Sequence, residues 1–116
     1  MKDKVNILGT EYKIYRNVEE EKEPRLKTSY GFCDCCTKEI FLSKEALTET
    51  EDSMKNLKEY ENKVLRHEII HAFLCESGLR ENSNRQIAWA ENEEMVDWIA
   101  IQFPKIEKVF KELNIL

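Results

Sequence analysis

One short stretch of this chain restricts its fold more than any other. His67-Glu68-Ile69-Ile70-His71 contains the only two histidines among 116 residues. From Ser53 to Ser77 there is neither glycine nor proline, and apolar or motif side chains recur every three or four residues, which predicts one long helix that stops at Gly78. Residues four apart project from the same helix face. The two histidines can therefore bind one metal ion, with Glu68 close to a metal-bound water.

The third metal ligand must come from elsewhere, because a catalytic zinc site takes three protein ligands and a water. No third histidine exists, so the missing ligand is a carboxylate or a thiolate. Glu93 and Asp97 are again four residues apart, on one face of a second predicted helix. Glu94 competes for the ligand position, but a shift of one residue turns a side chain by about 100°. Only one of Glu93 and Glu94 can face the metal.

Together the two segments resemble the gluzincins, zinc peptidases in which H-E-x-x-H is followed by N-E-x-x-x-D. On this resemblance Glu93 is the expected third ligand, and Asp97 is expected to accept the N–H of a ligand histidine, His67. The resemblance implies a zinc metallopeptidase with one Zn²⁺ per chain. Glu68 would then be the general base that activates water for attack on a peptide carbonyl. The zincin classes whose third ligand is histidine are excluded.

The second segment is also similar to the small ImmA/IrrE-type peptidases of phages and mobile elements. These carry a Glu, an Asn four residues on, an aromatic residue and Ala, and then a Pro near the helix end. Here Glu93, Asp97, Ile99, Ala100 and Pro104 occupy those positions, and Asp97 and Ile99 depart from the usual residues. The metal-site motifs span residues 67–104. The resemblance implies an enzyme encoded by a phage or mobile element, with a narrow peptide or protein substrate.

Two other classes of function fit the same motifs. The chain could be a zinc-binding regulatory domain without turnover, or a structural domain in which zinc only joins two helices. Glu68 favours the enzyme, because a purely structural site needs no carboxylate beside a water position. Gluzincins also use a Tyr or His to stabilise the oxyanion. With no spare histidine, the sequence leaves this role open among the four tyrosines, which are Tyr12, Tyr15, Tyr30 and Tyr60.

Length and composition set the broad class. A chain of 116 residues with 41% hydrophobic residues is expected to form one domain, residues 1–116. The net charge of −5 argues against a nucleic-acid partner, which would need clustered Lys and Arg. No run of 18 apolar residues and no signal-peptide pattern is present, so we expect no membrane partner and a cytoplasmic location. The oligomeric state stays open.

The four cysteines are expected to be free thiols. Cys33, Cys35 and Cys36 cluster at a predicted hairpin turn, and Cys75 lies one helical turn past His71. The spacing C-x-C-C lacks the second pair of a zinc ribbon, adjacent cysteines rarely bond comfortably, and the cytosol is reducing. A thiolate ligand or a redox-sensitive blocker of zinc is the alternative. Cys75 is expected to form a wall of the site.

The order of predicted elements indicates an α+β fold. Residues 5–8 and 12–15 predict one hairpin, and residues 30–33 and 39–42 predict another. The motif helix follows, then a helix that ends by Pro104, then a helix whose buried stripe is Ile106, Val109, Phe110 and Leu113. Strands before helices predict a short antiparallel sheet followed by a long active-site helix and two further helices.

An edge strand beside the active-site helix is expected to pair with an extended substrate in a zincin-like domain. Residues 39–42, the last predicted strand before the motif helix, are the candidate. A purely structural edge strand fits these residues equally well.

Overall fold

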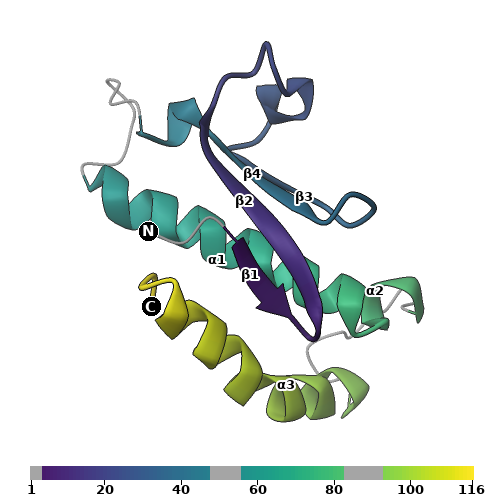
Figure 1. Cartoon of the computed structure of the whole chain (residues 1–116). Coiled ribbons are helices and arrows are strands. Elements are labelled where there is room, and N and C mark those ends of the chain that lie inside the picture. Colours follow the sequence, from purple (N-terminus) through teal and green to yellow (C-terminus); the bar gives the residue numbers. More distant parts are fainter. Residues whose placement is uncertain (1–3, 48–55, 83–92) are drawn as a thin grey trace.

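The computed structural model describes residues 4–47, 56–82 and 93–116 (Figure 1). The elements in chain order are β1 (Lys4–Ile7), β2 (Thr10–Val18), the 3₁₀ turn η1 (Pro24–Lys27), β3 (Gly31–Asp34), β4 (Glu39–Ser43), the 3₁₀ turn η2 (Lys44–Leu47), α1 (Leu57–Glu76), α2 (Leu79–Asn82) and α3 (Glu93–Glu112). The strands precede the helices, so the predicted α+β class is confirmed.

The four strands form one sheet in the order β1-β2-β4-β3. Both predicted hairpins are present as antiparallel pairs, β1 with β2 and β3 with β4. Between the hairpins, β2 pairs with β4 in parallel, with Ile14 opposite Ile40. The sheet is therefore mixed, and the prediction of a wholly antiparallel sheet is wrong for this pair. Hairpin patterns predict the pairing within each hairpin, but the docking of one hairpin on the other depends on the shared core.

The first hairpin turns over two residues whose backbone conformations suit a tight connection. Leu8 and Gly9 have φ values of 51° and 97°, as a primed two-residue turn requires. The side-chain oxygen of Asn6 accepts the N–H of Gly9 at 2.8 Å. Val5 and Ile7 alternate with exposed residues and point into the core.

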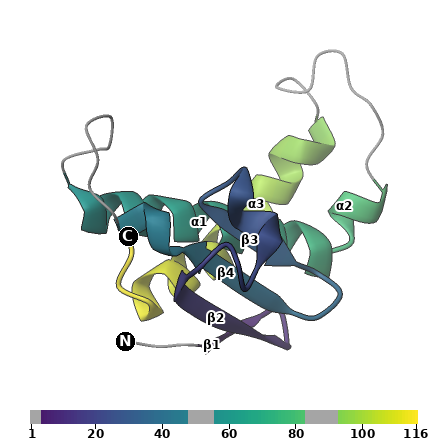
Figure 2. The same cartoon turned by 90° about the horizontal axis from the view of Figure 1, so that it is seen from above.

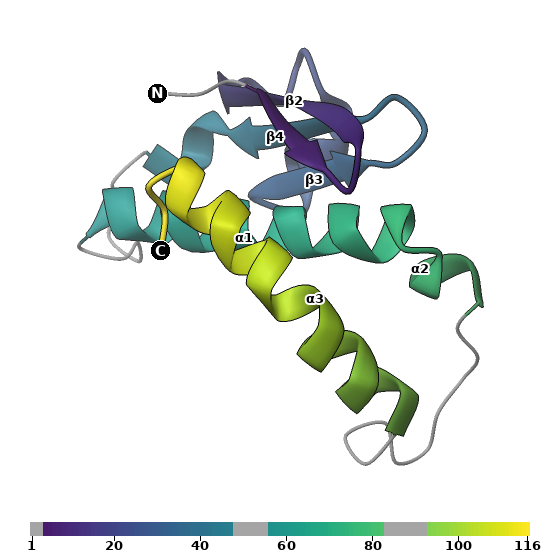
Figure 3. The same ribbon diagram turned by 60° about the horizontal axis from the view of Figure 1, so that its bottom comes forward.

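Helix α1 supplies both the core and the candidate site. It begins after Asn56, whose side chain accepts the N–H of Glu59 at 3.0 Å as an N-cap. The predicted start at Ser53 lies outside the described residues. Its core-facing residues are Leu65, Ile69, Ala72 and Phe73. Figure 3 shows the sheet on one side and α1 and α3 on the other. Only this face of α1 is buried, so His67 and His71 remain exposed.

Helix α3 runs through Pro104 without a break. The prediction of two helices separated at this proline is therefore wrong. Proline removes one helical hydrogen bond, but apolar contacts hold the helix beyond it: Ile106, Val109 and Leu113 are buried as predicted, and Phe110 is partly buried. Figure 2 shows the N-terminal half of α3 extending beyond the strands. Ile99 and Ile101 in that half, and Phe103 just after it, are exposed.

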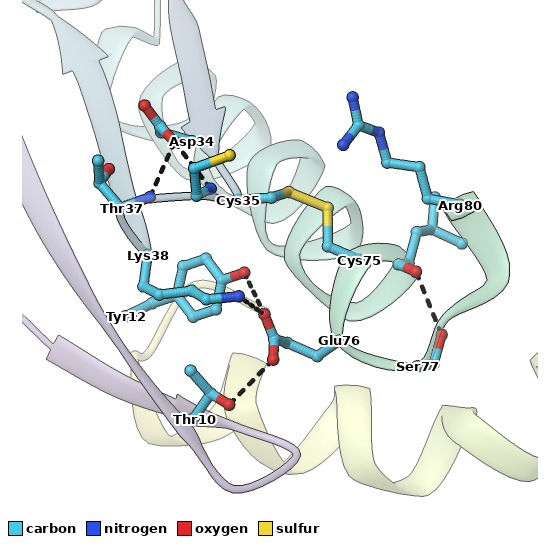
Figure 4. Close-up of polar contacts among 12 residues, drawn as sticks. Thr10, Tyr12, Asp34, Cys35, Thr37, Lys38, Cys75, Glu76, Ser77 and Arg80 are labelled. Carbon is cyan, nitrogen blue, oxygen red and sulfur yellow. Dashed lines mark hydrogen bonds and ion pairs between the residues drawn. A yellow bond between two sulfur atoms is a disulfide. The ribbon is translucent and has the colours of Figure 1, made fainter.

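A carboxylate at the end of α1 joins three parts of the fold. Glu76 accepts hydrogen bonds from Thr10 Oγ1 at 2.9 Å, from Tyr12 OH at 2.7 Å and from Lys38 Nζ at 2.7 Å (Figure 4). Burial raises the pKa of Glu76, but the hydrogen bonds from Lys38, Tyr12 and Thr10 outweigh it and hold the pKa below its ordinary value. The Glu76 network therefore ties the first hairpin and the β3–β4 turn to α1.

We expect Glu76→Gln to lower the free energy of unfolding at pH 7 by about 2 kcal/mol, because charge-assisted hydrogen bonds are lost. The pKa of Glu76 is lower in the folded protein than the value of 4.5 expected in the unfolded chain. Its charge therefore stabilises the folded protein fully when the pH is above 4.5, and this stabilisation is lost as the pH falls through the pKa of the folded state. The difference from wild type should therefore shrink below pH 4.5. Urea unfolding at pH 7, 5 and 3 tests this, with the exposed Glu11→Gln as control. A difference that does not depend on pH would contradict a role for the charge.

Candidate metal centre

His67 and His71 converge as a metal site requires. Their Nε2 atoms lie 3.2 Å apart on the exposed face of α1. Two nitrogens held about 2.05 Å from a tetrahedral ion are separated by about 3.3 Å. One ligand atom each from His67, Glu68 and His71 lies within 4.8 Å of the others. Both rings therefore fit one shared metal ion, and this group can hold one.

Glu68 lies between the two histidines in sequence but is buried, with 6% of its surface exposed. Burial raises the pKa of Glu68 to about 7. A carboxyl group in such surroundings is a better proton acceptor than one in water. The motif thus combines two solvent-facing imidazole rings with a desolvated carboxyl group beside them.

Gly31 allows this burial. A Cβ added at Gly31 would lie 2.7 Å from Val64 Cγ1 and 2.9 Å from Glu68 Oε2. The position requires glycine for lack of space, since the backbone of β3 packs directly on the carboxylate. Sequence reasoning did not single out Gly31. The only available signal was a glycine at the start of a predicted strand, and its neighbours across the fold are not visible in the sequence.

A cleft of about 350 Å³ lies beside the motif residues, between β3 and α1. Gly31 and Glu68 are at one end, and Cys35 and Cys75 are at the other. β3 therefore runs alongside α1 in the same direction as the helix. Because β3 is the last strand of the sheet and β4 lies between β2 and β3, the prediction that residues 39–42 form the edge strand is wrong. The edge strand next to the site is β3.

Cys35 and Cys75 form a disulfide across 40 residues of sequence, with their Cα atoms 6.3 Å apart (Figure 4). The expectation of free thiols is therefore wrong for this pair and right for Cys33 and Cys36. The β3–β4 turn lies against the last turn of α1, which brings the two cysteines within bonding distance. Cys75 lines the cleft as predicted. Burial, followed by the charge of Glu68, raises the pKa of Cys33 to about 12, so this thiol is protonated at neutral pH.

None of the four tyrosines lines the cleft in the part of the chain that the structure describes. Tyr12 is buried on Glu76, Tyr15 stacks on Phe41, and Tyr30 packs edge-on against Tyr60. The structure thus offers no support for a tyrosine oxyanion stabiliser. The cleft is instead lined by Arg80 of α2, which sequence reasoning missed because nothing in its spacing relates it to the motif.

The expected third ligand lies in the first turn of α3. The side chain of Glu93 falls outside the described residues, and those of Glu94 and Asp97 are exposed. Among the described side chains, no hydrogen bond joins Asp97 to His67. Trp98 Nε1 donates to Ser77 Oγ at 2.9 Å, which ties the second turn of α3 to the end of α1. The roles of Glu93 and Asp97 stay predictions.

Comparisons with family models, with curated proteins and with solved structures find no significant match to this chain. Within the described ranges, no helix combines the length and the apolar character needed to cross a membrane.

We expect Cys35→Ser to lower the free energy of unfolding by about 4 kcal/mol, because the disulfide closes a 40-residue separation and restricts the unfolded chain. Urea unfolding followed by circular dichroism measures the change. Cys36→Ser removes a neighbouring free, exposed thiol and should leave stability unchanged. Equal midpoints for Cys35→Ser and wild type, both prepared without reductant, would show that the bond does not contribute.

We expect Gly31→Ala to destabilise the protein by about 1–3 kcal/mol, because the added methyl overlaps Val64 and Glu68. The same change in a Val64→Ala background should cost less, since the atom at 2.7 Å is then absent. A double-mutant cycle from denaturant unfolding gives the coupling energy. A coupling energy of zero would mean that this contact does not limit the position.

Proposed function

We propose that this protein is a zinc-dependent metallopeptidase. The observation that carries the proposal is the Nε2 to Nε2 distance of 3.2 Å between exposed histidines, with the buried carboxyl group of Glu68 beside them. We assign His67, His71 and Glu93 as the ligands of one zinc ion and Glu68 as the general base. Asp97 is assigned to orient His67.

A zinc ion bound at this site would lower the pKa of a water molecule and polarise a peptide carbonyl. Glu68 accepts the proton of the attacking water and then passes it to the leaving amine. Its burial against Gly31 supports this role, because the carboxylate is held in place and partly freed of water. The cleft between β3 and α1 accommodates the substrate on the same side.

The free edge of β3 suits an extended peptide. The carbonyl of Tyr30 accepts the N–H of Ser43 at 2.9 Å. By the alternation of an antiparallel pair, Gly31 and Cys33 direct their backbone groups away from β4. The Ser29 hydroxyl hydrogen-bonds both backbone groups of Gly31. A substrate strand would replace this hydroxyl and continue the sheet by β-augmentation.

The competing function is a zinc-binding regulatory or structural domain. Structural zinc sites are closed by four protein ligands, whereas His67 and His71 are exposed and Glu68 faces a cleft. The end of α1 is already secured by the disulfide and by Glu76. A structural zinc site that only joins helices is therefore less well supported than a catalytic zinc site.

The resemblance to small phage-borne peptidases supports a narrow protein substrate. We also propose a cytoplasmic location. Cytosolic thiols are kept reduced, so the Cys35–Cys75 pair would need protection from reductants in that compartment or would be reduced there.

Zinc content by mass spectrometry tests the ligand set. We expect one zinc per chain in wild type, loss of zinc in His71→Ala and Glu93→Ala, and retention in Glu94→Ala. Glu94 neighbours the assigned ligand on the helix, so it is the matched control. Full zinc in Glu93→Ala would remove Glu93 as a ligand, and a wild type that takes up no zinc after reconstitution would overturn the proposal.

Glu68→Gln separates turnover from binding. Glu68 is assigned no direct bond to zinc, so the variant should keep its metal, whereas loss of a general base lowers turnover by about 10²–10⁴-fold. Digestion of a random peptide mixture, followed by mass spectrometry, measures the cleavage. Peptides cleaved by wild type and cleaved equally fast by Glu68→Gln would contradict the mechanism.

A further inference from the structure

Arg80 is the only lysine or arginine among the described residues that line the cleft of His67, Glu68 and His71. The chain leaves α1 at Gly78, which has a φ of 84°, and enters α2 with Leu79 and Arg80. The side chain of Arg80 is 60% exposed and forms an ion pair with Glu81 at 3.7 Å, so its guanidinium is accessible from solvent.

The end of α1, from which the chain continues to Arg80, is secured by two contacts. Cys75, in the last turn of α1, is bonded to Cys35, and Ser77 accepts a hydrogen bond from Trp98. Figure 4 shows Arg80 next to Cys75 and pointing away from Glu76. Arg80 lines the same cleft as His71 and Glu68, so its charge lies beside the motif.

Distance along the cleft separates Arg80 from the reaction itself. Glu68 and Cys75 are seven residues apart on α1, about 10 Å at 1.5 Å per residue. An extended peptide advances about 3.3 Å per residue. Arg80 lies next to Cys75 (Figure 4), so it faces a substrate residue up to about three positions from the scissile bond. Because the disulfide end of the cleft lies away from Glu68, the role of Arg80 concerns the flank of the substrate.

We propose that Arg80 determines specificity by binding a carboxylate on this flank of the substrate. The inference rests on the proposed peptidase function. Guanidinium binds carboxylate through two parallel hydrogen bonds, which lysine cannot reproduce. Among the described lining residues the acidic group is Glu68, whose ionised form would repel an acidic substrate. Arg80 therefore decides whether the cleft accepts one.

Strand direction places that carboxylate on the amino-terminal side of the scissile bond. β3 runs from Gly31 beside Glu68 towards Cys35 beside Cys75. A peptide antiparallel to β3 runs from the Cys75 end towards Glu68, so its earlier residues pass Arg80. Antiparallel pairing is slightly more stable per residue than parallel pairing. We therefore assign an Asp or Glu side chain of the substrate. A parallel peptide would instead present a later acidic residue or its free C-terminus.

Peptide capture on zinc-loaded Glu68→Gln protein tests this without requiring cleavage. The probes are decapeptide mixtures that are random except at two positions. One is a fixed central Leu, and the other is a Glu or a Gln placed either three positions before this Leu or three positions after it. Each mixture is made with a free or an amidated C-terminus. Mass spectrometry of the retained peptides gives the enrichment of Glu over Gln. The comparison is repeated with Arg80→Gln, Arg80→Lys and, as control, Lys63→Gln, which removes an exposed charge of α1 outside the cleft.

We expect roughly tenfold enrichment of Glu on the amino-terminal side, the size of one charge-assisted hydrogen bond. Arg80→Gln should abolish it, Arg80→Lys should retain part, and Lys63→Gln should leave it unchanged. The enriched peptides could instead carry Glu after the central Leu, or a free C-terminus. If Arg80→Gln abolishes that enrichment, the carboxylate site stands but the antiparallel placement of the substrate is overturned.

Enrichment that survives Arg80→Gln, or peptides bound without any preference for Glu, would overturn the inference and leave the proposed function standing. A wild-type chain that binds neither zinc nor peptide would overturn both.

Discussion

The close packing of β3 on α1 is the constraint on which the candidate centre depends. Gly31 brings the strand backbone against Glu68 and Val64, leaving no room for a Cβ. The carboxyl group is thereby buried, whereas His67 and His71, from the same two turns of helix, face solvent with their Nε2 atoms 3.2 Å apart. One helix therefore supplies core residues, two candidate metal ligands and a desolvated carboxyl group, because its faces meet different surroundings.

The end of α1 is where the rest of the fold is joined to the site. Glu76 receives hydrogen bonds from the first hairpin and from Lys38, Cys75 is bonded to Cys35, and Ser77 accepts from Trp98 of α3. These contacts link elements far apart in sequence to a single helical turn. They set the wall of the cleft opposite Glu68 and the starting point of α2. The proposed substrate site thus depends on packing outside the metal motif.

Predictions from short-range sequence patterns were correct for features that depend on a single helix or hairpin. Both hairpins, the motif helix and the buried residues of the last helix follow from short-range patterns, and all are present. The same rules failed at Pro104, where the lost hydrogen bond is offset by the burial of Ile106, Val109 and Leu113. They failed also for the β2–β4 pair, which is parallel because the second hairpin docks through β4.

By itself the sequence determined which residues can form a metal centre, since spacing within one helix dictates which side chains share a face. It also determined the α+β class, because strand and helix periodicities are local properties. Only the tertiary structure decided that Gly31 contacts Glu68, that Cys35 meets Cys75, that β3 is the strand beside the site and that Arg80 lines the cleft. The first three join residues that are distant along the chain, and the fourth depends on how the chain turns after α1. Such contacts arise from packing the sheet and helices around one core, and no spacing in the sequence encodes them.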